Sequence, residues 1–222
     1  VVPLKKISKP MRQAVVSRED RRFFRHAGVD IQGVMRAFVA TYVKKGATQG
    51  GSSLTQQYVK NVLLLQAQED NDPIAEYHAS EETVARKLRE MLIAVQMEKT
   101  YSKLEILQGY LNIAQFGRGI YGVEMAARRY FSTTADKLDI VQAATIAAIT
   151  KNPAAFDPSV ESNQKASQRE RNIVLDLMYQ EEYISQKQRD EAKAKPLKDT
   201  LKLQDAQAGC SASGDAAFFC DY

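Results

Sequence analysis

GGSSLTQQYVKN, residues 50–61, is the most informative stretch of this 222-residue chain. Gly50 and Gly51 permit backbone angles and close approaches that a side chain would block. Hydroxyls, amides and one cation follow directly: Ser52, Ser53, Thr55, Gln56, Gln57 and Lys60. Such a set suits a ligand rich in oxygen and negative charge, for example a sugar diphosphate. A plain Gly/Ser loop before a polar helix has the same composition, so the stretch needs support from elsewhere.

Two charged clusters flank this stretch and supply that support. Upstream, Glu19 and Asp20 form a carboxylate pair near the expected end of a helix. Downstream, residues 86–90 read RKLRE, which places Glu90 three and four positions after a lysine and an arginine, on one helix flank. Each cluster also has a purely structural interpretation. Glu19 would then be a helix-end glutamate paired with arginine, and Glu90 would belong to an ordinary surface ion pair. Carboxylates, amides and cations in this combination favour one site for an anionic substrate.

The composition indicates a folded protein without a membrane span of its own. A hydrophobic fraction of 44% and a charged fraction of 26% are ordinary for a globular chain. The most apolar charge-free run, residues 140–150, is well short of the ~20 residues that a spanning helix needs. The net charge of +4 fits work near phosphates or an anionic membrane, but it is feeble for nucleic-acid binding and no nucleic-acid motif is present.

The two cysteines, Cys210 and Cys220, lie in a Gly/Ser/Ala-rich tail. They can close a small disulfide loop in an oxidising compartment, or they can be free thiols. A metal site is disfavoured, because two sulfurs without a nearby histidine form an incomplete ligand set.

The pattern predicts helices almost throughout and no sheet. Ser8 is expected to cap a first helix that ends near Glu19, and residues 26–28 look like a break. A second helix is expected from Asp30 through Tyr42, ended by a Lys-Lys-Gly sequence.

The middle and C-terminal parts follow the same helical pattern. Residues 66–80 are polar and contain a proline, so we expect a mobile loop or insertion, with Ser80 capping the next helix. That helix carries an apolar stripe at helical spacing: Val84, Leu88, Met91, Leu92 and Val95. Ser102 opens a capping box, and residues 136–149 are expected to form a core helix. Residues 169–179 and 185–193 are expected to form the last two helices.

These motifs together resemble the peptidoglycan glycosyltransferase domain of bifunctional class A penicillin-binding proteins, the family-51 glycosyltransferases. Five motifs agree in order: residues 19–30, 50–61, 86–98, 103–112 and 127–131. The resemblance extends from about residue 3 to 195. Two departures keep a polar group: Ser53 stands where the family usually has threonine, and Gln108 where an acid is frequent.

The resemblance implies an all-α, lysozyme-like fold with a head lobe and a membrane-proximal jaw lobe. It assigns residues 1–196 to the glycosyltransferase domain and 197–222 to a linker or the start of a missing transpeptidase region. Residues 34–43 would either enter the membrane interface or form an amphipathic core helix. The parent protein is expected to have a membrane anchor before residue 1 and to work at the extracytoplasmic face of the bacterial cell membrane.

The implied reaction polymerises lipid II. The 4-hydroxyl of the incoming disaccharide attacks the anomeric carbon of the lipid-linked glycan chain, undecaprenyl pyrophosphate leaves, and the linkage inverts to β-1,4. Glu19 is the expected base. Glu90 is expected to orient cations, or to hold a divalent ion, around the diphosphate. The residues expected to bind substrate are Ser52, Thr55, Gln56, Gln57, Lys60, Arg86 and Lys103.

The resemblance also sets expectations for partners. A divalent cation, Mg or Mn, is left open without an assigned metal ligand. The expected partners are lipid II, the membrane surface and a covalently linked transpeptidase domain, and a moenomycin-like phosphoglycolipid is the expected inhibitor. The rivals are a lysozyme-like hydrolase or lytic transglycosylase, and a non-catalytic glycan-binding module.

Overall fold

The computed structural model describes residues 1–38 and 51–204. In these residues the regular structure is helical, apart from one isolated bridge between Gln115 and Tyr121. The helices are α1 (Lys9–Glu19), α2 (Ile31–Phe38), α3 (Leu54–Glu69), α4 (Pro73–Ser80), α5 (Val84–Thr100), α6 (Lys103–Ile113), α7 (Val123–Phe131), α8 (Ile140–Ile149), α9 (Gln164–Gln180), α10 (Gln186–Ala194) and α11 (Leu197–Thr200). The predicted all-α class is confirmed for the described residues.

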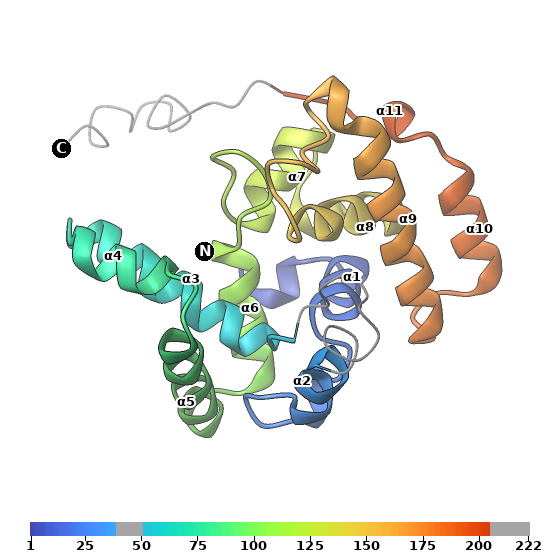
Figure 1. Ribbon diagram of the computed structural model, residues 1–222. Helices are drawn as coiled ribbons and strands as arrows, with labels where there is room; N and C mark the ends of the chain where they lie inside the picture. The colour runs from blue at the N-terminus through green and yellow to red at the C-terminus, as the bar shows by residue number, and fades with distance from the viewer. Residues whose placement is uncertain (39–50, 205–222) are drawn as a thin grey trace.

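The helices gather into a larger and a smaller group (Figure 1). The larger group is built on α8, which packs against α1 and α9. The smaller group is built on α3, which packs against α4 and α5 and is joined to the larger group through α6. Figure 1 shows α3, α4 and α5 on the left, α9 and α10 on the right, and α6 between them.

The core of the larger group forms around α8 because its side chains are small. Ala143, Ala144, Ala147 and Ala148 are fully buried, which lets the neighbouring helices approach closely. Asp139 caps the start of the helix with a capping box. The core helix predicted over residues 136–149 is therefore confirmed.

Helix α1 is placed by its cap and by its apolar face. The hydroxyl of Ser8 accepts a hydrogen bond from the Met11 amide at 3.2 Å, as predicted. Met11, Ala14 and Val15 are fully buried against the core. Glu19 is the last residue of the helix, so the backbone turns away immediately after it.

The expectation of a loop over residues 66–80 is wrong. Helix α3 continues to Glu69, and α4 occupies Pro73–Ser80. Asp72 starts α4 by accepting hydrogen bonds from the amides of Ile74 and Ala75, both at 3.0 Å, and Pro73 presets the first helical angle. These local signals outweigh the polar composition.

The predicted cap at Ser80 is also wrong. The hydroxyl of Ser80 donates to the carbonyls of Glu76 and Tyr77, so Ser80 ends α4. Thr83 caps α5 instead, accepting a hydrogen bond from the Arg86 amide at 3.1 Å. The start of α5 therefore lies a few residues later than expected.

The apolar residues of α5 share one face, but that face is exposed. Val84, Leu88 and Leu92 are 77%, 55% and 73% exposed. The face turned inward carries Arg86, Glu90 and Ala94. An apolar helix face left this exposed, with no covering element among residues 1–38 and 51–204, is typical of a binding surface.

The end of the described chain is attached to the larger group. Leu197 is buried, and the amides of Lys202 and Gln204 donate to the carbonyls of Tyr130 and Arg129. The domain boundary at residue 196 stays a prediction. Cys210, Cys220 and the predicted continuation of α2 beyond residue 38 lie outside the described residues.

Gly28, in the loop after α1, lies in close contact with α5 and with the start of α3. Its φ is +81°, and a Cβ added there would lie 2.7 Å from the backbone carbon of Ala94 in α5. Its carbonyl accepts a hydrogen bond from the hydroxyl of Ser53 at 2.5 Å. The loop after α1 thus touches α5 and the start of α3 directly.

We expect Gly28→Ala to lower the free energy of unfolding by about 2–4 kcal/mol, from left-handed strain and from the clash with α5. Gly119 is the matched control: its φ is +69°, and a Cβ there would meet nothing within 4 Å. Gly119→Ala should therefore cost about 1 kcal/mol, from backbone strain alone. Urea unfolding of both variants measures the difference, and equal losses would contradict the close approach of Gly28 to α5.

Candidate active site

The carboxylate of Glu19 lies where three helices meet. The side-chain amide of Gln57, in the first turn of α3, donates to its Oε2 at 2.7 Å. The hydroxyl of Thr150, at the end of α8, donates to its Oε1 at 2.5 Å. Both oxygens of Glu19 are thus held by side chains from separate elements, and the carboxylate is only partly buried.

Thr150 has a second acceptor within reach. Its hydroxyl lies 2.8 Å from the carbonyl of Ala147, one turn earlier in α8. A hydroxyl has a single proton to donate, and a carboxylate is the stronger acceptor. The bond to Glu19 is therefore the favoured one while that group is ionised.

Tyr110 fixes the orientation of Gln57. The buried hydroxyl of Tyr110 lies 3.4 Å from Oε1 of Gln57 and donates to it, which turns the amide nitrogen toward Glu19. Burial raises the pKa of Tyr110 well above its usual range, and the charge of Glu19 adds to that rise. Tyr110 therefore stays protonated and remains a donor.

Asp20 locks the end of α1 to the start of α3. Its Oδ2 accepts a hydrogen bond from the Leu54 amide at 3.0 Å and lies 2.8 Å from Nε2 of His26. Asp20 is 6% exposed, so it does not meet substrate directly. This geometry suits a role for Asp20 in positioning the neighbouring groups.

A second cluster surrounds Glu90, which is 2% exposed. Arg86 forms an ion pair with its Oε1, and Nζ of Lys87 lies 2.9 Å from its Oε2. Lys87 also donates to the hydroxyl of Ser52 at 2.9 Å. The structure thus brings together three predicted residues, Ser52, Arg86 and Glu90.

Three other predicted substrate-binding residues make internal contacts. Thr55 is fully buried and donates to Glu98, and Nζ of Lys103 lies 2.7 Å from the same carboxylate. Gln56 is 1% exposed and forms a capping box with Ser53 at the start of α3. The structure does not place these groups beside Glu19 or Glu90, and their contact with substrate stays a prediction.

Lys60 is placed differently. It lies one helical turn after Gln57 in α3, and its ammonium forms no ion pair within residues 1–38 and 51–204. Positions three apart on a helix are neighbours on its surface. Lys60 therefore lies next to Gln57 on the surface of α3, and no carboxylate of the described residues pairs with its ammonium.

The acids of the described residues do not form a metal site. No group of three His, Cys, Asp or Glu side chains converges there to hold an ion. Both oxygens of Glu90 are engaged by cations, so this carboxylate does not fit a divalent ligand set. The Mg or Mn ion left open by the sequence stays a prediction, and no chemical step is assigned to it.

Two members of the site were not among the predicted site residues. The sequence places Lys87 three residues before Glu90, and this i,i+3 spacing is the signal that predicts their contact. Thr150 was missed, because a hydroxyl at the end of a buried helix has no sequence signal for a contact with Glu19. Only the packing of α8 against α1 brings the two together.

The Glu90 cluster yields a test of stability. We expect Glu90→Gln to lower the free energy of unfolding by about 3–5 kcal/mol, because the Arg86 charge would stay buried without a partner. The control is Glu191→Gln, which breaks the i,i+4 pair with Lys187, where the two side chains are 61% and 85% exposed. That change should cost less than about 0.5 kcal/mol. Urea titration measures the free energy of unfolding of both variants. Similar small losses would show that the Glu90 cluster contributes little to stability.

Comparison with known proteins identifies the family. Residues 1–179 match the family model described as Transglycosylase. The chain is 38% identical over 196 residues to "Penicillin-binding protein 1A" of Aquifex aeolicus, covering 88% of this chain and 25% of that protein. It is 37% identical over 178 residues to "Biosynthetic peptidoglycan transglycosylase" of Thiobacillus denitrificans, covering 80% and 69%.

A solved structure, penicillin-binding protein 1A from Haemophilus influenzae, also matches, at 24% identity and a TM-score of 0.39. That match covers 68% of this chain and 17% of the solved one. The chain spans about a quarter of the length of several curated relatives that it matches. The family match over most of the sequence confirms the resemblance drawn from the five motifs: the chain belongs to the transglycosylase family.

Proposed function

We propose that this chain is a peptidoglycan glycosyltransferase that polymerises lipid II into β-1,4 glycan strands. The observation that carries the proposal is the Glu19 carboxylate, held at both oxygens by Gln57 and Thr150, with the cation of Lys60 one turn away. A partly exposed carboxylate oriented by two donors suits proton abstraction from a sugar hydroxyl. A cation one helical turn from Gln57 suits the charge of a departing diphosphate. The family membership supports the same assignment.

In the proposed reaction Glu19 removes the proton from the 4-hydroxyl of the incoming lipid II. A carboxylate offers about four lone-pair sites. Gln57 and Thr150 occupy two of them, which leaves acceptor capacity for the substrate hydroxyl while the orientation of the group stays fixed. The oxygen then attacks the anomeric carbon of the growing chain, the bond to the diphosphate breaks, and the configuration inverts.

The departing undecaprenyl pyrophosphate needs positive charge. Arg86 and Glu90 are buried together, so we assign Arg86 to holding Glu90 in place and not to the diphosphate. Lys87 differs, because its side chain is 39% exposed. Lys87 and Lys60 are therefore the cations of the described residues that we assign to the diphosphate, with Ser52 orienting Lys87.

The exposed apolar face is assigned to the membrane surface. It consists of Leu88 and Leu92 of α5, and we assign Ile31 and Met35 of α2, which are 72% and 59% exposed, to the same membrane surface. Among the described helices none is long and apolar enough to cross a bilayer. An apolar face of this kind suits insertion into the headgroup region instead. We place the enzyme at the extracytoplasmic face of the membrane, and a linked transpeptidase domain stays a prediction.

Replacing Glu19 with glutamine tests the base. We expect Glu19→Gln to lower the rate of lipid II polymerisation by about 10²–10⁴-fold, because glutamine is nearly isosteric but cannot accept the proton. Gel analysis of glycan products measures the rate. Polymerisation at the parent rate would remove Glu19 as base, and cleavage of preformed glycan without polymerisation would support a hydrolase.

Thr150 supplies the matched control pair for this test. Thr150→Val removes the hydroxyl while keeping the shape, and we expect about a tenfold loss of rate from a misoriented base. Thr150→Ser keeps the donor and should restore most of the rate. Equal rates for the two variants would show that the hydrogen bond to Glu19 does not matter for turnover.

The membrane face yields a separate test. We expect the double variant Leu88→Ser/Leu92→Ser to bind phosphatidylglycerol vesicles about tenfold more weakly, because it removes two exposed apolar side chains. Co-sedimentation measures the binding. Ile173→Ser, at a 42% exposed apolar residue of α9, is the control and should bind as the parent does. Equal loss in both variants would contradict the assignment of this face.

A further inference from the structure

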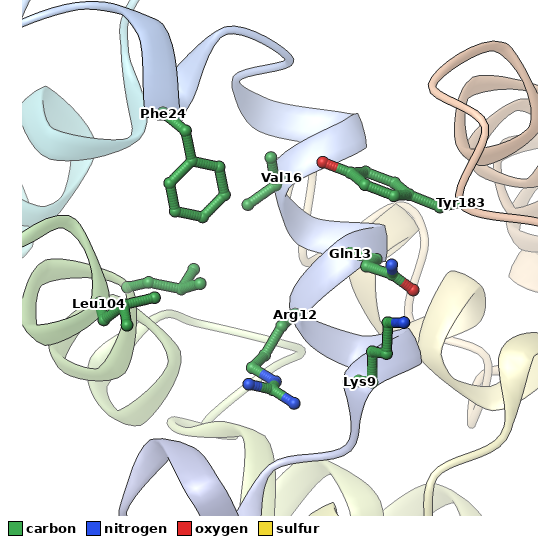
Figure 2. Close-up of a pocket in the computed structure, with 8 residues that line it drawn as sticks. Lys9, Arg12, Gln13, Val16, Phe24, Leu104 and Tyr183 are labelled. Carbon is green, nitrogen blue, oxygen red and sulfur yellow. The ribbon is translucent and has the colours of Figure 1, made fainter.

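A pocket of about 280 Å³ lies between α1, α6 and the turn after α9 (Figure 2). It shares no lining residue with the candidate active site. Its floor consists of Val16 and Leu107, which are both buried. Its walls include Phe24 and Leu104, which are 52% and 55% exposed although they are large and apolar. The pocket therefore presents an apolar interior whose rim remains uncovered.

The rim carries positive charge that nothing in the described residues neutralises. Lys9 and Arg12 lie one turn apart on α1 and line the pocket. Neither forms an ion pair within residues 1–38 and 51–204. The Nε atom of Arg12 is buried and has no hydrogen-bond partner there. Because Nε is closed to solvent, a ligand carboxylate would meet the guanidinium of Arg12 at its terminal nitrogens, in a charge-assisted hydrogen bond.

An amide in the lining of the pocket narrows the class of ligand. Gln13 lines the pocket on the side of Lys9 and Tyr183 (Figure 2), and its side-chain amide forms no hydrogen bond within the described residues. An amide offers a donor and an acceptor together, which matches the N–H and C=O of a peptide bond. A phospholipid acyl chain would need a long apolar path, whereas the apolar interior here is short and bordered by polar groups on α1.

We propose that this pocket binds an acidic peptide segment of a partner protein. A leucine-sized or aromatic side chain of the segment packs on Val16 and Leu107. A neighbouring carboxylate meets the guanidinium of Arg12 and the ammonium of Lys9, and a peptide bond pairs with Gln13. Exposed Phe24 and Leu104 are covered when the segment is bound. The binding site is independent of the proposed glycosyltransferase activity.

The test uses the full chain and an array of immobilised octapeptides of randomised sequence. We expect enrichment of peptides that carry aspartate or glutamate next to a large apolar residue. Arg12→Glu should weaken binding of an enriched peptide by about tenfold, measured by fluorescence anisotropy. Lys165→Glu is the matched control: it makes the same change of charge at an exposed lysine of α9 outside the pocket, and it should bind as the parent does.

A second variant keeps the result interpretable if Arg12→Glu folds poorly. Leu104→Ser leaves the charges intact at a half-exposed position, and we expect it to weaken binding by about threefold. Enrichment of basic peptides, an array without enrichment, or equal binding by Arg12→Glu and Lys165→Glu would overturn the proposal. So would displacement of the enriched peptide by phosphatidylglycerol vesicles at this pocket, since that would assign it to lipid.

Discussion

The buried carboxylate of Asp20 is the contact on which the arrangement of the site depends. It joins the end of α1 to the start of α3 by accepting from the Leu54 amide and by pairing with His26. One residue earlier in the chain stands Glu19, and three residues after Leu54 stands Gln57. Because the two helix ends are held together at Asp20, Glu19 and Gln57 meet without a long side chain having to span a gap. The hydrogen bond at Glu19 thus follows from a structural contact beside it.

The two carboxylates of the site differ in what surrounds them, and the difference separates their roles. Glu19 is held by two neutral donors, which orient it without neutralising its charge. Glu90 is held by two cations in a buried setting, so its charge is already balanced. A proton acceptor needs free acceptor capacity and access, which Glu19 has. A sealed ion pair contributes fixed geometry instead, and here it positions Lys87 near Ser52.

Local signals in the sequence predicted the elements that are set locally. Ser8 and residues 136–149 predicted α1 and α8, because a cap and an uninterrupted apolar run act within a few residues of chain. Asp72 before a proline is a usable start signal for α4, but the polar composition of residues 66–80 predicts a loop and conceals it. The contact between Thr150 and Glu19 could not be predicted, since it depends on how α8 packs against α1. Glu19 and Glu90 could be singled out from the sequence because they belong to motifs with fixed spacing, and their roles stay predictions.

The orientation of α5 could not be predicted either, and it has a consequence for the proposed function. Periodicity shows which residues share a face, but it does not show what covers that face. In this structure Leu88 and Leu92 point outward while Arg86 and Glu90 point inward on the same helix. A helix with its side chains is about 10 Å across, and Lys87 directly precedes Leu88, so the ammonium of Lys87 lies at the side of the apolar face, within about one helix diameter of it. If that face meets the bilayer, the cations lie at headgroup depth, where the diphosphate of a membrane-anchored lipid is found. One helix then sets both the contact with the membrane and the level at which the leaving group is bound.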